Sequence, residues 1–117
     1  METQKYAVFA FRGDPMCFIH VLLNGLDLHA KGHQGLIILE GEALTLVPEM
    51  AKPDHMLNKL YQKAKQAKIL HGACKACSVK LKVDKAIKDE GIPFIDDMSG
   101  HPSIAAFIEK GYQIIPF

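Results

Sequence analysis

Two cysteines separated by two residues are the clearest chemical feature of this sequence. Cys74 and Cys77 lie in residues 71–77, which follow a short apolar run and lead into a helical pattern. A thiol in the exposed first turn of a helix faces backbone N–H groups and the positive end of the helix dipole, and both favour the reactive thiolate. Lys75 adds a cation, and His71 lies three residues before Cys74. We therefore expect a lowered pKa for the Cys74 thiol.

The spacing of the pair also bears on its function. Cys77 lies one helical turn beyond Cys74 on nearly the same face, within reach of a disulfide. A single cysteine is most often a small buried apolar residue, whereas two at this spacing on a strand-to-helix turn are typical of thiol or metal chemistry. The third cysteine, Cys17, has the apolar neighbours Met16 and Phe18 and is interpreted as a packed residue. We therefore predict Cys74 and Cys77 as the catalytic pair.

Zinc binding is the main chemical alternative for this segment. His71, Cys74 and Cys77 offer three ligands within seven residues, with Cys17 or His101 as a possible fourth. Structural zinc sites normally have two pairs of closely spaced ligands, and this sequence has one. A thioredoxin-type oxidoreductase also fits poorly. Its cysteine pair follows the first strand of its motif unit in an aromatic-Cys-Gly-Pro context, whereas the pair in this sequence follows the third predicted strand and lacks that context. We therefore expect no resident metal and no organic cofactor.

Two further residues are candidates because ligands of open α/β sheets bind beyond the carboxyl ends of the strands. Arg12 follows the first predicted strand and precedes a helix N-terminus, a place where an anion can bind. His101 precedes the last predicted helix, where it is either an active-site base or a cap. We predict Arg12, His71, Lys75 and His101 as supporting residues around the cysteine pair.

The hydrophobic pattern predicts the elements that position these residues. Five apolar runs are typical of buried strands, at residues 5–11, 35–40, 68–72, 92–95 and 112–115. Helical spacing predicts four helical regions, at residues 15–31, from the cap Asp54 through Ala64, at 73–83 with a further turn that ends at 90, and at 101–110. Residues 42–52 suit either a short helix or a loop. This order predicts a single α/β domain over residues 1–117. Its sheet should be open, mostly parallel and five-stranded, with helices on both faces and flavodoxin-like or Rossmann-like layering.

Composition restricts the class of protein. A chain of 117 residues with 49% hydrophobic and 23% charged residues suits one folded domain. Its net charge of +1 provides no field to attract nucleic acid or an anionic membrane. The sequence has no signal-peptide pattern and no apolar run near the ~20 residues of a membrane span. Three cysteines, an odd number, do not suit a secreted disulfide framework. We therefore expect a cytoplasmic protein without nucleic-acid or membrane partners.

The sequence also resembles a known family. The order of elements, the strand-end segment 72–77, the Gly91-Ile92 step and the tail at 111–116 are similar to the DsrE/DsrF-like family of small cytoplasmic sulfur-handling proteins. The resemblance covers nearly the whole chain. It implies an α/β domain that assembles into trimers or hexamers, and a cysteine after the third strand that carries sulfane sulfur as a persulfide. Cys74 matches that cysteine, and Cys77, present in part of the family, would have a resolving or second-carrier role.

These observations lead to the hypothesis of a sulfurtransferase-like relay protein. Cys74 would accept sulfane sulfur from a donor protein or a low-molecular-weight polysulfide and pass it to the thiol of an acceptor protein. The alternatives are a non-catalytic oligomeric module that binds a nucleotide or an anion, and a Cys/His zinc-binding protein. The apolar stretches 43–47 and 114–117 further predict a homo-oligomer, a trimer or hexamer by the family resemblance, with these segments at its interfaces.

Overall fold

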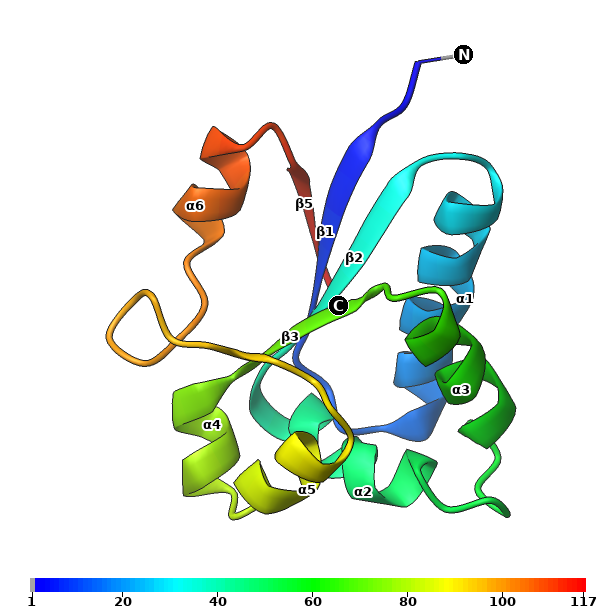
Figure 1. The fold of residues 1–117 in the computed structure, drawn as a ribbon, viewed down its shortest axis with the longest axis vertical. Coiled ribbons are helices and arrows are strands. Elements are labelled where there is room, and N and C mark those ends of the chain that lie inside the picture. Colours follow the sequence, from blue (N-terminus) through cyan, green and yellow to red (C-terminus); the bar gives the residue numbers. More distant parts are fainter. Residues whose placement is uncertain (1) are drawn as a thin grey trace.

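The computed structural model describes residues 2–117 and contains one open sheet of five parallel strands (Figure 1). The strands are β1 (Lys5–Ala10), β2 (Gln34–Leu39), β3 (Leu70–Cys74), β4 (Phe94–Ile95) and β5 (Gln113–Pro116), in the spatial order β4-β3-β2-β1-β5. Each pair of neighbouring strands is parallel. The predicted open five-stranded α/β sheet is therefore confirmed.

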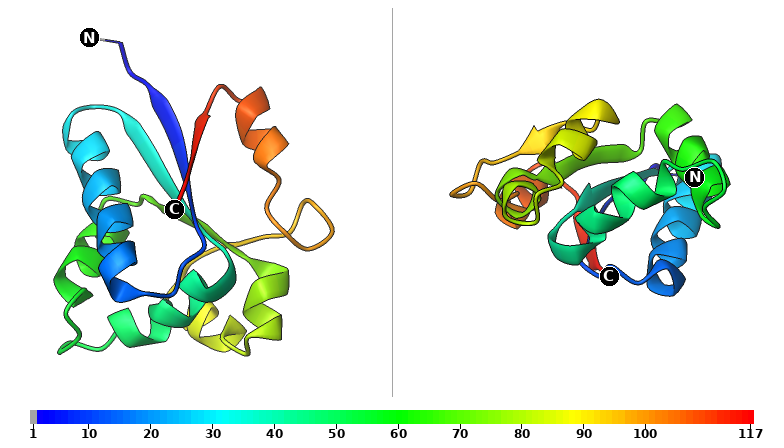
Figure 2. Two further views of the ribbon diagram at one scale, coloured as in Figure 1. Left: turned by 180° about the vertical axis from the view of Figure 1, so that it is seen from behind. Right: turned by 90° about the horizontal axis from the view of Figure 1, so that it is seen from below.

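Helices connect the strands and lie on both faces of the sheet (Figures 1 and 2). They are α1 (Pro15–Ala30), the 3-10 helix η1 (Gly41–Thr45), α2 (Leu46–Met50), α3 (Asn58–Gln66), α4 (Lys75–Lys80), α5 (Asp84–Asp89) and α6 (Ile104–Glu109). Helices α1 and α3 cover one face and α6 covers the other, while α2, α4 and α5 gather near the carboxyl ends of the strands. Over residues 2–117, no helix has the length and apolar character needed to cross a bilayer.

The sheet separates two hydrophobic cores, because alternate residues of a buried strand point to opposite faces. In β1, Val8 belongs to the larger core, to which α1 and α3 also contribute, and Phe9 belongs to the smaller one. In the smaller core the ring of Phe9 meets Phe107 of α6 edge to face, with 5.5 Å between centroids. The site described below lies where the larger core reaches the carboxyl edge of the sheet.

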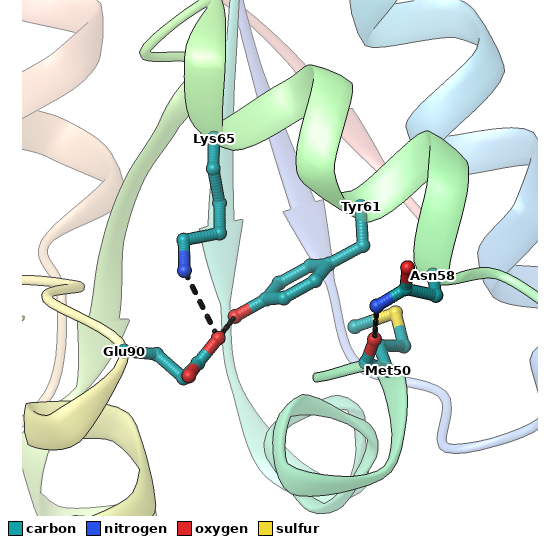
Figure 3. A network of polar contacts seen from close by, with 5 residues as sticks. All are labelled: Met50, Asn58, Tyr61, Lys65 and Glu90. Carbon is teal, nitrogen blue, oxygen red and sulfur yellow. Dashed lines mark hydrogen bonds and ion pairs between the residues drawn. The ribbon is translucent and has the colours of Figure 1, made fainter. Parts of the chain in front are cut away.

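Several predicted boundaries were wrong for local reasons. The helix predicted to be capped by Asp54 begins at Asn58, because turns occupy residues 51–57 around Pro53. The Asn58 side chain donates a hydrogen bond to the carbonyl of Met50 at 2.9 Å and so connects α2 to α3 (Figure 3). The third strand begins at Leu70 rather than Lys68, since Lys68 has a φ of 60°, outside the strand region. Residues 42–52, for which a helix and a loop were both open, contain η1 and α2.

The apolar stretch 43–47 is also not where it was expected. Ala43, Leu44 and Val47 have no exposed surface, and Leu46 is 5% exposed, because η1 and α2 pack into the larger core of the single chain. The prediction that this stretch forms an oligomer interface is therefore wrong. Residues 114–117, by contrast, are half-buried or exposed along the edge strand β5.

Candidate functional site

Cys74, Cys77 and His101 come together at the carboxyl end of β3. The Sγ atoms of the two cysteines and a ring nitrogen of the histidine lie within 4.8 Å of one another. The Sγ of Cys74 is 3.1 Å from Nδ1 of His101, and the Sγ of Cys77 is 3.9 Å from the same nitrogen. We refer to these three residues as the thiol–imidazole cluster. The fold therefore joins the predicted cysteine pair to a histidine that stands 27 positions beyond Cys74.

Cys74 is both the last residue of β3 and the N-cap of α4. The backbone N–H of Cys77 donates a hydrogen bond to its Sγ at 3.3 Å. The hydroxyl of the buried Ser78 donates to the carbonyl oxygen of Cys74 at 2.7 Å. The strand end and the first turn of α4 thus hold both cysteines in place.

The loop of residues 96–103 holds His101 against α4. The backbone N–H of Ala76 donates to the carbonyl of Gly100 at 2.9 Å, and the backbones of Met98 and His101 bond to each other at 2.8 and 2.9 Å. Gly100 has a φ of 90°, and a Cβ added there would lie 3.2 Å from the Cβ of Ala76. This left-handed conformation and close approach both favour glycine. Backbone contacts therefore determine where the ring of His101 lies.

Burial dominates the acid–base behaviour of Cys74. The residue has no exposed surface, and burial raises the pKa of its thiol to about 12. The N–H of Cys77 acts in the opposite direction, and the carboxylate of Glu40 adds to the increase. Lys75 points to Asp96, at 3.9 Å, and α4 has six residues, so neither a close cation nor a long helix dipole offsets the burial. The predicted exposure and lowered pKa of Cys74 are therefore wrong, and the thiol needs an adjacent proton acceptor.

Glu40, the last residue of the second predicted strand, is a further polar residue of this edge and was not among the predicted supporting residues. It directly follows β2, whose last residue Leu39 pairs with Ala73, so Glu40 stands beside Cys74. Glu40 is 9% exposed, and burial raises the pKa of its carboxyl group, while His101 acts in the opposite direction. Its position at the carboxyl end of a predicted strand is the signal in the sequence that points to it.

Two predicted supporting residues lie away from the cluster. The ring of His71 meets Phe107 of α6 edge to face, with 5.7 Å between centroids, and burial lowers its pKa. Arg12 and Cys17 line a separate open cavity of about 390 Å³ between the start of α1 and the end of β5. Cys17 is half-buried there. The expected assembly of His71 and Arg12 with the cysteine pair is therefore not what the fold produces.

These features describe a parallel α/β protein with two thiols and one imidazole at the carboxyl edge of its sheet. The sequence matches no family model. It is 32% identical over 97 residues to the uncharacterized protein MJ0733 of Methanocaldococcus jannaschii, across 83% of this chain and 77% of that protein. An uncharacterized protein of Archaeoglobus fulgidus is 32% identical over 62 residues, across 53% of this chain and all of that protein. The chain belongs to the same family as MJ0733.

A solved structure has the same fold. The conserved protein of unknown function BT1422 from Bacteroides thetaiotaomicron superposes with a TM-score of 0.72, at 19% sequence identity, across 97% of this chain and 95% of that one. Identity at this level supports a common fold and does not extend to activity.

Proposed function

We propose that this protein is a sulfur-relay protein, similar to the DsrE/DsrF-like proteins, which carries sulfane sulfur as a persulfide on Cys74. The supporting observation is the 3.1 Å contact between the Sγ of Cys74 and Nδ1 of His101. A buried thiol is a poor nucleophile until it loses its proton. An imidazole nitrogen at this distance is placed to accept that proton, in the manner of other Cys–His pairs.

In the loading step, Cys74 attacks the outer sulfur of a donor persulfide or of a polysulfide. A bond forms between the Sγ of Cys74 and the sulfane sulfur, while the sulfur–sulfur bond of the donor breaks and its electron pair leaves with the donor thiolate. The proton that His101 accepted passes to that thiolate. One sulfur–sulfur bond replaces another, so the step needs no external oxidant or reductant.

In the discharge step, His101 accepts the proton of an acceptor thiol, the resulting thiolate attacks the outer sulfur of the persulfide, and Cys74 leaves as a thiolate. The N–H of Cys77, 3.3 Å from the Sγ of Cys74, stabilises the returning charge, and His101 then passes the acceptor's proton to Cys74. The thiolate of Cys77 offers a second route. It attacks the Sγ of Cys74, closes a Cys74–Cys77 disulfide and expels hydrosulfide.

Access to the site restricts how the relay works. Cys74 has no exposed surface, whereas Cys77 and His101 are half-buried. A donor therefore approaches over those two residues and requires the loop 96–103 to move aside by local opening. We propose cytoplasmic donor and acceptor proteins, or low-molecular-weight polysulfides, as partners. The unpaired edge of β5 supports a homo-oligomer as part of the same proposal.

Intact-mass spectrometry after polysulfide treatment tests this proposal. The reduced wild-type protein should gain the mass of one sulfur atom, and peptide mapping should place that sulfur on Cys74. Cys74→Ser should gain none, while the matched control Cys17→Ser should load like the wild type. His101→Gln should load roughly 10²- to 10⁴-fold more slowly, as expected when a general base is lost. Equal loading of Cys74→Ser and the wild type would contradict the proposal.

A further inference from the structure

We infer that the thiol–imidazole cluster is a binding site for a thiophilic divalent cation, Zn²⁺, with the sulfurs of Cys74 and Cys77 and Nδ1 of His101 as its protein ligands. This inference goes beyond the sulfur relay and does not depend on it. It also replaces the ligand set that sequence spacing suggested, because His71 lies against Phe107 and Cys17 lines a separate cavity.

The distances between the donor atoms suit tetrahedral coordination. Zinc bonds of about 2.3 Å to sulfur and about 2.0 Å to nitrogen place neighbouring donor atoms of a tetrahedron about 3.5 to 3.8 Å apart. In this structure Nδ1 of His101 is 3.1 Å from the Sγ of Cys74 and 3.9 Å from that of Cys77, and all three donors lie within 4.8 Å of one another. Shifts of less than about 1 Å, within the range of rotamer adjustment, therefore produce the coordination geometry.

The backbone already holds the ligands in place. Cys74 and Cys77 are fixed by the end of β3 and the first turn of α4, and His101 is fixed by a loop whose Gly100 accepts a hydrogen bond from Ala76. The ligands thus come from two segments that are distant in the sequence, and these segments are already in contact with each other. Less conformational entropy is then lost on binding than in a site that the metal must assemble.

The chemistry of the donors selects the metal. Two thiolates and one imidazole are ligands preferred by zinc, whereas magnesium and calcium prefer oxygen. Binding displaces both thiol protons, and the two negative charges of the thiolates then balance the cation. Within residues 2–117, no histidine, cysteine or carboxylate joins these three residues as a fourth ligand. Three protein ligands with one open position is the arrangement of catalytic rather than structural zinc.

Titration with Co²⁺, a coloured substitute for Zn²⁺, tests the inference on the reduced, metal-free full chain. We expect one Co²⁺ per chain, with the intense visible absorption of four-coordinate cobalt and a thiolate charge-transfer band, both removed by added Zn²⁺. His101→Gln and Cys77→Ser should weaken Zn²⁺ binding by about 100-fold or more, since even loss of an outer-shell partner weakens metal binding by about 10- to 100-fold. The matched controls His71→Gln and Cys17→Ser should bind like the wild type.

Thermal unfolding provides a second measurement that also checks the folding of each variant. Added Zn²⁺ should raise the Tm of the wild type, His71→Gln and Cys17→Ser, and should raise that of His101→Gln much less at the same concentration. Absence of the cobalt bands in the wild type would overturn the inference. Equal Zn²⁺ affinity in His101→Gln and the wild type, or loss of binding in His71→Gln, would overturn the ligand assignment. The mass assay for sulfur is run without metal, so its outcome is independent of these results.

Discussion

A polar network joins α3 to the end of α5, and the thiol–imidazole cluster joins α4 to the loop 96–103, but the two have opposite effects on the charge of their central group. In the network, the Tyr61 hydroxyl donates to Oε1 of Glu90 at 2.6 Å, and Nζ of Lys65 donates to the same oxygen at 3.0 Å (Figure 3). Burial acts to raise the pKa of Glu90, but the hydrogen bonds from Tyr61 and Lys65 outweigh it and lower that pKa. The network therefore stabilises a charged group.

The cluster instead disfavours the charged form of its central thiol, that of Cys74. Burial raises the pKa of Cys74, although its Sγ contacts Nδ1 of His101 at 3.1 Å, the N–H of Cys77 at 3.3 Å and the carbonyl of Gly100 at 3.8 Å. These contacts do not outweigh burial, so the thiol keeps its proton until a reaction with sulfur or a bound cation displaces it. A charge with strong hydrogen bonds stabilises the fold, whereas the cluster holds its thiols ready for chemistry. We therefore expect substitutions in the network to change stability and substitutions in the cluster to change reactivity.

Tyr61→Ala should have the largest effect on stability. The ring is fully buried in the larger core, and its loss leaves a cavity and removes one donor to Glu90. We expect a decrease of about 3–5 kcal/mol in the free energy of unfolding, measured by urea denaturation. Cys74→Ser should lower the same quantity by only about 1 kcal/mol, because the buried serine hydroxyl keeps the hydrogen-bond partners of the sulfur at His101 and Cys77, while it abolishes sulfur loading. Loss of loading by folded Tyr61→Ala would show that the two regions are not separate.

Glu90→Gln should destabilise the protein by about 1–2 kcal/mol at neutral pH, because it removes the charge from two hydrogen bonds. The folded pKa of Glu90 lies below its ordinary value of 4.5, so its contribution is present above that value and is lost as the pH falls through the lowered pKa. The stability difference between the wild type and Glu90→Gln should therefore shrink in acid, as measured by urea denaturation between about pH 7 and pH 3.

The control for Glu90→Gln is Asp27→Asn, which removes an exposed ion pair with Lys31 on α1. The side chains of Lys31 and Asp27 are 66% and 60% exposed, so this pair should contribute little to stability. An equal pH dependence of stability in wild type and Glu90→Gln would show that the charge on Glu90 does not stabilise the fold.

The contrast between the regions also explains what the sequence could predict. The strands and the strand-to-helix junction at the cysteine pair follow from continuous apolar runs and neighbouring glycines, which are local signals, although the third strand extends to Cys74 instead of ending at Gly72. His101 was selected because it follows a strand in an open α/β sheet. Its contact with Cys74 depends on how residues 96–103 pack on α4, and no local pattern encodes that packing.

The wrong predictions have the same physical origin. His71 is near Cys74 in the sequence, but its ring lies against Phe107, in contact with α6 instead of the cluster. The pKa of Cys74 was predicted from its neighbours along the chain, whereas burial by distant segments determines it. The end of the second predicted strand was a signal for Glu40, but its place beside Cys74 depends on the register that brings β2 beside β3.

A comparison of Gly100→Ala with Gly111→Ala should distinguish the effect of displacing the His101 ring from the effect of backbone strain alone. Gly100 and Gly111 have φ values of 90° and 89°, but an added Cβ meets Ala76 at 3.2 Å in the first case and nothing within 4 Å in the second. Both alanine variants should lose about 1–2 kcal/mol of unfolding free energy, because a side chain is strained at positive φ. Only Gly100→Ala should displace His101, and we expect it to slow sulfur loading and weaken Co²⁺ binding. The same effect in Gly111→Ala would trace the loss to general destabilisation.

Cys77→Ser should have a small effect on stability, within about 0.5 kcal/mol, because Cys77 is half-buried and serine is nearly isosteric. The backbone N–H that donates to the Sγ of Cys74 is retained, so sulfur loading should be retained as well.

The Cys77→Ser substitution should instead change how long the persulfide on Cys74 lasts. In the wild type, Cys77 attacks Cys74, closes a disulfide and expels hydrosulfide, and serine does not support this exchange. A time course of intact mass under mild oxidation should therefore show a longer-lived sulfur adduct in Cys77→Ser than in the wild type or Cys17→Ser. Equal decay in all three proteins would exclude Cys77 as the resolving thiol and leave it as a metal ligand alone.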